Sequence, residues 1–132
     1  MDNKANLVKY RIEQAEQCLK ISKTCVDFDD YKAAANRSYY CVFNAIRSLL
    51  ALDRVDFKKH KGVMNYFREK YIKTRIFDDK LSDILLELFE IRGSSDYDDF
   101  YIVSKEEVTK QIANAEYFLE QIKEYLGNKS EE

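Results

Sequence analysis

Residues 31–50 read YKAAANRSYYCVFNAIRSLL, and this stretch decides the fold. It holds neither glycine nor proline, the two residues that most disfavour a helix interior. Its small and apolar side chains recur at the spacing of one helix face: Ala34, Ala35, Ser38, Tyr39, Val42, Phe43, Ile46 and Leu50. A second face carries polar side chains at steps of three and four residues: Arg37, Tyr40, Asn44 and Arg47. We therefore predict an amphipathic helix with one packed side and one ordered polar side.

The rest of the chain predicts four more helices. Apolar stripes of helical period place them at about residues 5–26, at about 59–72, from 78 or 79 to 91 or 92, and from 104 onward. Aspartates within 27–30 are expected to cap the second helix, because a carboxylate accepts from the free N–H groups at a helix start. Gly93 is expected to end the fourth helix, and Ser104 with Glu107 forms a capping-box pattern for the fifth.

The chain of 132 residues has no proline and three glycines, and it shows no strand pattern, linker or repeat. Five amphipathic helices of these lengths indicate an all-α fold. We expect an antiparallel up-and-down bundle of four long helices plus one short helix. Residues 1–132 form a single domain in this interpretation, and the polar tail over 126–132 is expected to fray.

The composition narrows the classes of function. A formal net charge of −2 argues against tight non-specific binding to duplex nucleic acid. No apolar run reaches transmembrane length, and the three cysteines lack CxxC spacing, which favours a cytoplasmic protein with reduced thiols and no membrane association. A single histidine, without a glycine-rich phosphate loop, gives no metal or cofactor motif, so we expect neither.

The segment Arg92-Gly-Ser-Ser-Asp96-Tyr97 is the first candidate site. A guanidinium group at a helix end can bind phosphate through two hydrogen bonds, and Asp96 can orient it. The alternative is that Arg92 caps the carbonyl groups of its own helix and pairs with Asp96 to fix the loop. The sequence leaves both interpretations open.

The polar stripe of the second helix is the other candidate. Two arginines with a tyrosine can hold an RNA backbone or stack a base, although a solvated face or a dimer contact explains them as well. His60, the only histidine, is more often a surface or capping residue than a catalyst. The acidic run Asp96, Asp98 and Asp99 is interpreted as solvated rather than metal-binding.

Taken together, these segments resemble a known family. Residues 36–45, NRSYYCVFNA, are similar to the second helix of small prokaryotic HEPN proteins, which reads roughly N-R-x-Y-Y-A-x-F-H-A. His60-Lys61-Gly62-Val63 is similar to the start of the family's third helix, and Ile91-Arg92 followed by Asp96-Tyr97 is similar to its R-x-x-x-D-Y element. The similarity keeps this order over nearly the whole chain.

The resemblance implies a bundle of four to five helices that forms a homodimer. Many members are encoded beside a minimal nucleotidyltransferase, in toxin–antitoxin or related defence modules. Catalytic members are metal-independent endoribonucleases with an Arg-x(4–6)-His motif from each protomer at the dimer interface. There the ribose 2′-OH attacks the adjacent phosphate, His acts as acid or base, and Arg stabilises the phosphate charge.

This sequence departs from that motif, because Tyr97 stands where the family has His, and Asn44 matches the family's second-helix His. A tyrosine phenol, with a pKa of about 10, is a poor base at neutral pH. The resemblance therefore implies a protein that binds RNA or a nucleotide and acts with a nucleotidyltransferase-type partner. The expected site is an inter-protomer cleft lined by Arg37, Tyr40, Asn44, Arg92, Asp96 and Tyr97.

Two alternatives to binding stay open. One is an active endoribonuclease toxin, for which the catalytic candidates are Arg92 with His60 or Tyr97. The other is a non-catalytic interaction module in which the Arg92–Asp96 pair only fixes a loop. The resemblance also implies that Tyr97 or Tyr101 is a modification target of a partner nucleotidyltransferase, as tyrosines near the motif are in some relatives.

Overall fold

The computed structural model describes residues 3–130, and these residues confirm the predicted all-α class. They form α1 (Asn3–Asp27), α2 (Tyr31–Leu52), α3 (His60–Phe67), α4 (Asp79–Tyr97) and α5 (Lys105–Ser130), with no strand in this range. A π-helical turn, η1 (Arg68–Ile72), continues α3. Within residues 3–130, every helix is too short or too polar to cross a lipid bilayer.

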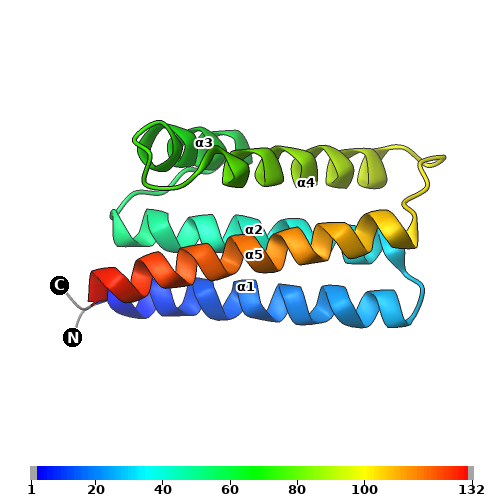
Figure 1. Ribbon diagram of the computed structural model, residues 1–132, viewed down its shortest axis with the longest axis horizontal. Helices are drawn as coiled ribbons and strands as arrows, with labels where there is room; N and C mark the ends of the chain where they lie inside the picture. The colour runs from blue at the N-terminus through cyan, green and yellow to red at the C-terminus, as the bar shows by residue number, and fades with distance from the viewer. Residues whose placement is uncertain (1–2, 131–132) are drawn as a thin grey trace.

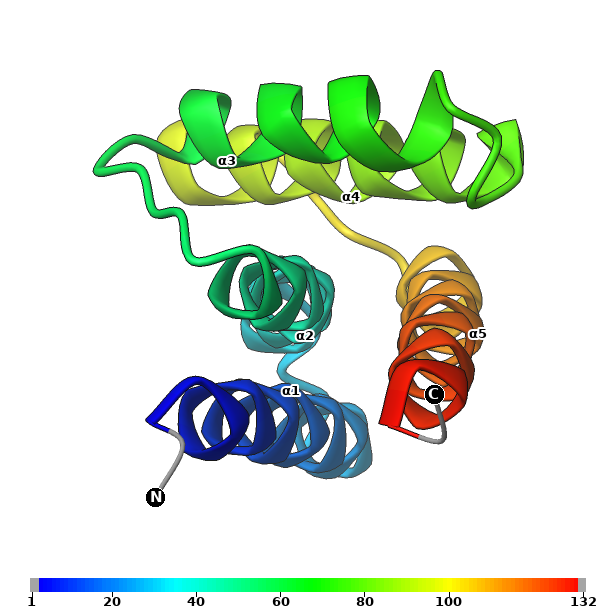
Figure 2. The same cartoon turned by 90° about the vertical axis from the view of Figure 1, so that its left-hand side faces the viewer.

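The central helix of the arrangement is α2, which packs against α1, α3, α4 and α5. Figure 1 shows α1 and α2 running in opposite directions, with α5 alongside them. In Figure 2, α3 and α4 form a layer on one side of these three helices, and α3 runs across their direction. The polar side of α2 therefore lies where α1, α3 and α4 can each contribute side chains to it.

The packed face of α2 is the one that the sequence predicts. Tyr39, Val42 and Ile46 of that face have no exposed surface, and full burial of such a side chain contributes about 1.5–3 kcal/mol to folding. Leu49, which the predicted face did not include, is fully buried as well. The small residues at the start of α2 allow α1 to approach closely. Ser22 Oγ of α1 donates a hydrogen bond of 2.6 Å to the backbone oxygen of Ala34. This contact fixes the register between α1 and α2.

The predicted caps are confirmed at two helix starts. Asp30 Oδ1 accepts from the backbone N–H of Ala33 at 3.2 Å at the start of α2. Ser104 Oγ accepts from the backbone N–H of Glu107 at 3.0 Å at the start of α5. The Glu107 carboxylate accepts from the Tyr101 hydroxyl at 3.3 Å, which attaches the α4–α5 loop to α5.

The predicted end of α4 at residue 91 or 92 is wrong, because the helix continues through Gly93 to Tyr97. Gly93 does not adopt the left-handed backbone that a glycine stop requires. Two contacts support the extra turn. Arg92 and Asp96 form an ion pair one turn apart, and Ser95 is buried. Tertiary contacts thus override the weak helix propensity of Gly-Ser-Ser-Asp.

Gly93→Ala is expected to stabilise the protein by about 0.5–1 kcal/mol, because alanine is the better residue in a helix interior. A Cβ at Gly93 meets no atom within 4 Å, so the change creates no clash. Urea unfolding followed by circular dichroism measures the effect. Gly62→Ala is the matched control, since its Cβ would lie 3.1 Å from Phe57 Cβ and the stabilisation should be lost. A destabilised Gly93→Ala protein would contradict the helical assignment.

The C-terminal helix also runs further than expected. The sequence predicts a tail over 126–132, whereas α5 continues through Gly127 to Ser130. Leu126 packs against the core, and Lys129 Nζ lies 5.6 Å from the centroid of the Tyr125 ring. These contacts explain the continuation. Residues 131 and 132, the end of the predicted tail, lie outside the described residues.

Candidate functional site

Tyr40 contacts two arginines that come from different helices. The guanidinium carbon of Arg37, on α2, lies 5.0 Å from the centroid of the Tyr40 ring. The guanidinium carbon of Arg92, on α4, lies 5.6 Å from the same centroid, and Arg92 Nη2 donates to the Tyr40 hydroxyl at 3.3 Å. Cation–π contacts of this kind hold a guanidinium group over an aromatic face. Packing of α4 on α2 thus brings together residues 52 positions apart.

Two further side chains join the arginines into one network. Asp96 Oδ2 lies 2.9 Å from Arg92 Nε, and Asn36 Nδ2 donates to the same oxygen at 3.4 Å. Asn36 Oδ1 accepts from Arg37 Nε at 3.0 Å and from Arg37 Nη2 at 2.6 Å. We call Asn36, Arg37, Tyr40, Arg92 and Asp96 the arginine–tyrosine cluster.

The network leaves hydrogen-bonding capacity on Arg92. Its Nε atom is buried, and the N–H is not aligned with the Asp96 oxygen, so this contact is an ion pair without a well-formed hydrogen bond. A guanidinium group carries five N–H donors in a fixed plane. Arg37, Tyr40 and Arg92 are each partly exposed, so a ligand can reach part of each residue.

Tyr97 does not join the cluster. Because α4 continues past Gly93, Tyr97 lies five residues after Arg92 on one helix, which rotates it about 140° away. Its side chain is 81% exposed. Asp96, four residues after Arg92, shares the face of Arg92 instead. The expectation that Arg92, Asp96 and Tyr97 form a compact group therefore holds for the first two residues only.

Asn44 also makes its contacts elsewhere. Its side-chain Nδ2 donates to the backbone oxygen of Tyr40 at 3.0 Å and lies 3.8 Å from Cys18 Sγ on α1. These contacts place Asn44 in the seam between α1 and α2, next to the cluster but without a direct contact to Arg92. Of the six residues predicted to bind ligand, the structure thus assembles Arg37, Tyr40, Arg92 and Asp96.

His60 lies at the start of α3 and packs against Tyr39, Tyr40 and Phe43 of α2. Its Nδ1 is 2.9 Å from the Tyr39 hydroxyl, and its ring stacks on Phe43 with centroids 4.1 Å apart. Tyr39 also contacts a cation, because the Arg92 guanidinium carbon lies 5.5 Å from the centroid of its ring. Burial lowers the pKa of His60 below 6.5, and the charges of Arg92 and Arg47 lower it further. The imidazole is therefore neutral at neutral pH.

The lowered pKa of His60 predicts a pH dependence of stability. Below about pH 6.5 the unfolded chain binds a proton at His60 more readily than the folded chain does. The free energy of unfolding therefore decreases as the pH is lowered. We expect the wild type to lose more stability than His60→Gln between about pH 7.5 and pH 5.5. Urea titrations at several pH values measure this difference. Parallel losses in the two proteins would show that His60 titrates freely in the folded state.

A hollow lies beside the cluster, between the end of α1, the start of α2 and the end of α4. Its volume is about 500 Å³, and Asn36, Arg37 and Asp96 form one wall. Lys32 adds a cation to its rim. Ser95 also lines it, and Ser95 Oγ is buried without a hydrogen-bond partner among the described residues. No sequence pattern pointed to Ser95 by itself, because its position beside the hollow depends on the extra turn of α4.

The chain is similar in sequence to a known family. The model of the HEPN domain family matches residues 8–125, which include every residue of the cluster. The chain belongs to the HEPN domain family. The predicted resemblance to small prokaryotic HEPN proteins is therefore confirmed.

Three relatives of this HEPN chain come from an archaeon and a bacterium. It is 33% identical to the "Putative toxin MJ0142" of Methanocaldococcus jannaschii over 119 residues, covering 90% of this chain and 81% of the relative. It is 29% identical to a "UPF0332 protein" of Thermotoga maritima, covering 96% of each chain. It is also 29% identical to the "Putative toxin MJ0605" of M. jannaschii, covering 87% of this chain and 85% of the relative.

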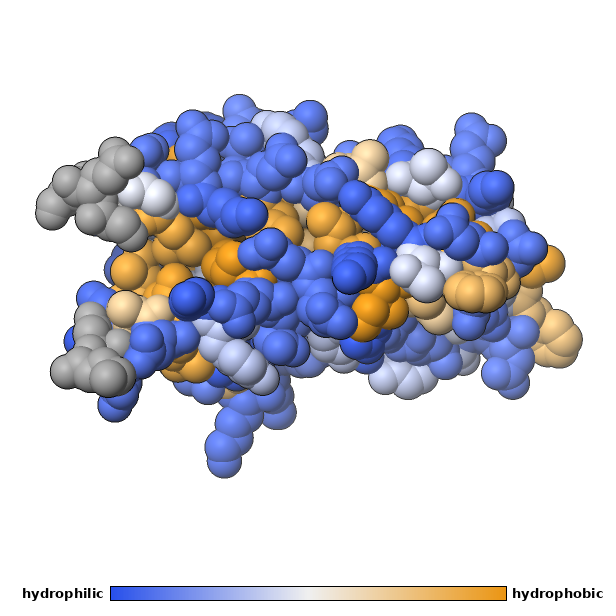
Figure 3. Space-filling view, turned by 90° about the horizontal axis from the view of Figure 1, so that it is seen from below, coloured by the Kyte–Doolittle hydropathy of each residue, from blue (hydrophilic) through white to orange (hydrophobic). Residues whose placement is uncertain are grey.

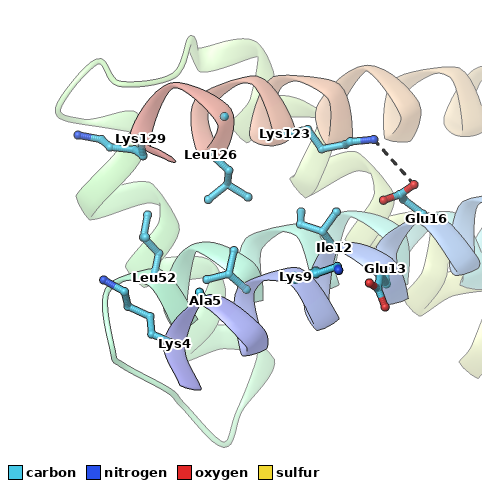
Figure 4. Close-up of a pocket in the computed structure, with 12 residues that line it drawn as sticks. Lys4, Ala5, Lys9, Ile12, Glu13, Glu16, Leu52, Lys123, Leu126 and Lys129 are labelled. Carbon is cyan, nitrogen blue, oxygen red and sulfur yellow. Dashed lines mark ion pairs between the residues drawn. The ribbon is translucent and has the colours of Figure 1, made fainter. Parts of the chain in front are cut away.

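A second hollow of the HEPN domain is chemically different. Its volume is about 560 Å³, and it lies between the N-terminal part of α1 and the C-terminal part of α5. Figure 3 shows apolar surface there between bands of hydrophilic side chains. Figure 4 shows Ala5, Ile12, Leu52 and Leu126 facing the hollow, with an ion pair between Lys123 and Glu16 at its edge. No residue of the arginine–tyrosine cluster lines it, so it adds nothing to the predicted site.

Residues 3–130 of the HEPN domain contain no group of three or more His, Cys, Asp or Glu side chains suited to a metal ion. Burial raises the pKa of the Cys18, Cys25 and Cys41 thiols, which keeps them protonated and poorly nucleophilic at neutral pH. The polar chemistry around the cluster therefore comes from arginine, tyrosine and the neutral His60.

Proposed function

We propose that this HEPN chain binds RNA or a nucleotide at the arginine–tyrosine cluster. The observation that carries the proposal is the placement of two guanidinium groups over one partly exposed phenol ring, at 5.0 and 5.6 Å. Arginine binds phosphate through paired hydrogen bonds, and an aromatic face stacks an unpaired base. Asn36 and Asp96 hold the two arginines in position without neutralising both, since only Arg92 has a carboxylate partner here.

The wider role in the proposal is a toxin–antitoxin or defence module. Two relatives carry printed names that call them putative toxins, which supports this part. The proposed protein is a homodimer with the cluster in its interface cleft, and it acts with a nucleotidyltransferase-type partner. Tyr97 is the better candidate for modification by such a partner because it is 81% exposed. Tyr101 donates its hydroxyl to Glu107, and burial, followed by the Glu107 charge, raises the pKa of Tyr101.

The test replaces Tyr40, whose ring contacts both arginines. Tyr40→Leu keeps an apolar side chain but removes the aromatic face and the hydroxyl. We expect it to weaken binding of a fluorescein-labelled single-stranded RNA about 5- to 100-fold, the range for loss of a stacked base. Fluorescence anisotropy measures the affinity. Tyr117→Leu is the matched control, because Tyr117 makes its own cation–π contact with Lys80 at 4.4 Å, away from the cluster. Equal affinities of the two variants would refute the site.

A second candidate function is endoribonuclease activity, and the observation that favours it is the neutral His60 beside Arg92. In this case His60 would take the proton of the ribose 2′-OH as that oxygen attacks the phosphate. The bond to the 5′-oxygen then breaks, and water supplies the proton for the leaving oxygen. Cleavage of RNA in EDTA that is lost in His60→Gln and kept in Tyr97→Phe supports this candidate. Binding without cleavage by the wild type rejects it.

A further inference from the structure

A second pair of arginines lies further along α2, outside the arginine–tyrosine cluster. Arg47 follows Tyr40 by seven residues, two helical turns away on nearly the same side of α2. The other member, Arg11, comes from α1. Its Nε atom is buried and has no hydrogen-bond partner among the described residues. No feature of the sequence singled out Arg11.

The register between α1 and α2 explains why these two arginines meet. The helices run in opposite directions, with Ser22 bonded to Ala34 and Cys18 in contact with Asn44. Counting eleven residues back from Ser22 and on from Ala34, or seven back from Cys18 and on from Asn44, places Arg11 opposite residues 45–51 of α2, the stretch that holds Arg47. Burial lowers the pKa of Arg11, and the nearby Arg47 charge lowers it further, as expected for two cations placed together.

The second pair is only weakly neutralised. Arg47 Nη2 lies 3.7 Å from Asp56 Oδ2, and the Asp56 side chain is 65% exposed. An exposed pair at this distance contributes about 0–1 kcal/mol, so an anion can replace the carboxylate. The Asp56 charge also acts on Arg11, so one exposed carboxylate serves both arginines. The two guanidinium groups therefore offer a second anion site.

The spacing of the two arginine pairs matches a chain of phosphates. Arg37 and Arg47 are ten residues apart on α2, which corresponds to about 15 Å along the helix axis. Tyr40 lies between them, with His60 packed against Phe43 at the same level of α2. A nucleoside monophosphate cannot reach both arginine pairs, whereas an oligonucleotide can.

We infer that Arg11 and Arg47 form a second phosphate position on α2, so that an oligonucleotide bound at the cluster places one phosphate at Arg37 and Arg92 and a later phosphate at Arg11 and Arg47. The inference rests on the proposed function, which it deepens by adding this second position to the site. A single strand is favoured over a duplex because an unpaired base is free to stack on Tyr40 between the two phosphate positions. A chain with a net charge of −2 also lacks the basic excess that duplex binding requires.

The test compares two probes, adenosine monophosphate and a single-stranded RNA hexanucleotide, by isothermal titration calorimetry. We expect the wild type to bind the hexanucleotide at least about tenfold more tightly than the monophosphate. Arg47→Gln and Arg11→Gln should each weaken hexanucleotide binding about 5- to 20-fold and leave the monophosphate affinity unchanged. Each variant should also reduce the slope of log affinity against log salt by about 0.7, the value for one lost phosphate contact with a single strand. Arg75→Gln, which removes an exposed arginine paired with Asp79, is the matched control.

The outcomes distinguish failure of the second phosphate position from failure of the arginine–tyrosine cluster as a binding site. If the two probes bind with equal affinity, or if neither variant changes the hexanucleotide affinity, the second phosphate position is refuted. Either result is compatible with ligand binding at the cluster. Arg92→Gln tests the cluster itself, because it should weaken binding of both probes. If neither probe binds, or if Arg92→Gln binds both as the wild type does, the proposed function fails and the inference fails with it. A loss of hexanucleotide binding in Arg47→Gln and Arg11→Gln alone supports the inference.

Discussion

Arg92→Ala is expected to weaken binding of single-stranded RNA by about 10- to 100-fold, which corresponds to the loss of a charge-assisted contact of about 1.5–3 kcal/mol. The guanidinium carbon of Arg92 lies 5.5 Å from the Tyr39 centroid and 5.6 Å from the Tyr40 centroid, so Arg92 contacts both rings. Its loss removes one phosphate donor and frees Asp96, whose negative charge then opposes the ligand. Fluorescence anisotropy with a labelled RNA measures the change.

The matched control for Arg92 is Arg75→Ala. Arg75 pairs with Asp79 at 3.1 Å, also one helical turn apart, but its side chain is 76% exposed and lies in the α3–α4 connection. Both variants remove one positive charge and one such pair, so only Arg92→Ala should affect RNA. The folded state should lose about 0–1 kcal/mol in Arg75→Ala, whose pair is exposed, and about 1–3 kcal/mol in Arg92→Ala, whose side chain is 17% exposed and packs on Tyr39 and Tyr40. If Arg92→Ala lowers stability while RNA affinity is unchanged, the chain is a structural interaction module and Arg92 has no part in a ligand site.

Asp53→Ala is expected to have the largest effect on stability among polar replacements, a loss of about 2–4 kcal/mol in the free energy of unfolding. Asp53 Oδ2 accepts from the Tyr71 hydroxyl at 2.6 Å and from the Tyr66 hydroxyl at 3.0 Å, and it lies 3.5 Å from Lys70 Nζ. Tyr71 is almost fully buried, so alanine would leave its hydroxyl without a partner. The clamp joins the end of α2 to α3 and η1, and burial followed by the Asp53 hydrogen bond raises the pKa of Tyr71.

Urea unfolding followed by circular dichroism measures the effect of Asp53→Ala, and Asp56→Ala serves as its control. Asp56 is a nearby carboxylate that is 65% exposed and has one long ion pair, so its loss should cost less than about 0.5 kcal/mol. Asp53→Asn keeps an acceptor for the tyrosines and should lose about half as much stability as the alanine variant. Similar losses in Asp53→Ala and Asp56→Ala would contradict the clamp.

The sequence predicted most of the helical framework because helix faces and caps are local. The apolar period of residues 31–50 gave the buried side of α2, and Asp30 and Ser104 marked two helix starts. Gly93 was misjudged because a glycine stop is a statistical preference. Here the ion pair of Arg92 with Asp96 and the burial of Ser95 extend α4 by more than a turn. One wrong helix end then misplaced Tyr97, since a residue five positions on points to a different side.

The site was predictable where its members lie on one helix, and less so where helices meet. Arg37 and Tyr40 share a stripe that the sequence shows directly. The contacts of Tyr40 with Arg92 and of Tyr39 with His60 depend on how α3 and α4 pack on α2, which no local pattern encodes. Arg11 and the Asp53 clamp were missed for the same reason.

The most direct measurement of the central claim is an NMR titration that follows the Nε–Hε signals of individual arginines, assigned with single Arg→Lys variants. We expect a single-stranded RNA hexanucleotide to shift the signals of Arg37 and Arg92 together, at the same RNA concentration, and to leave that of Arg75 in place. If the RNA leaves the Arg37 and Arg92 signals unmoved, or moves one without the other, then α2 and α4 do not form one ligand site.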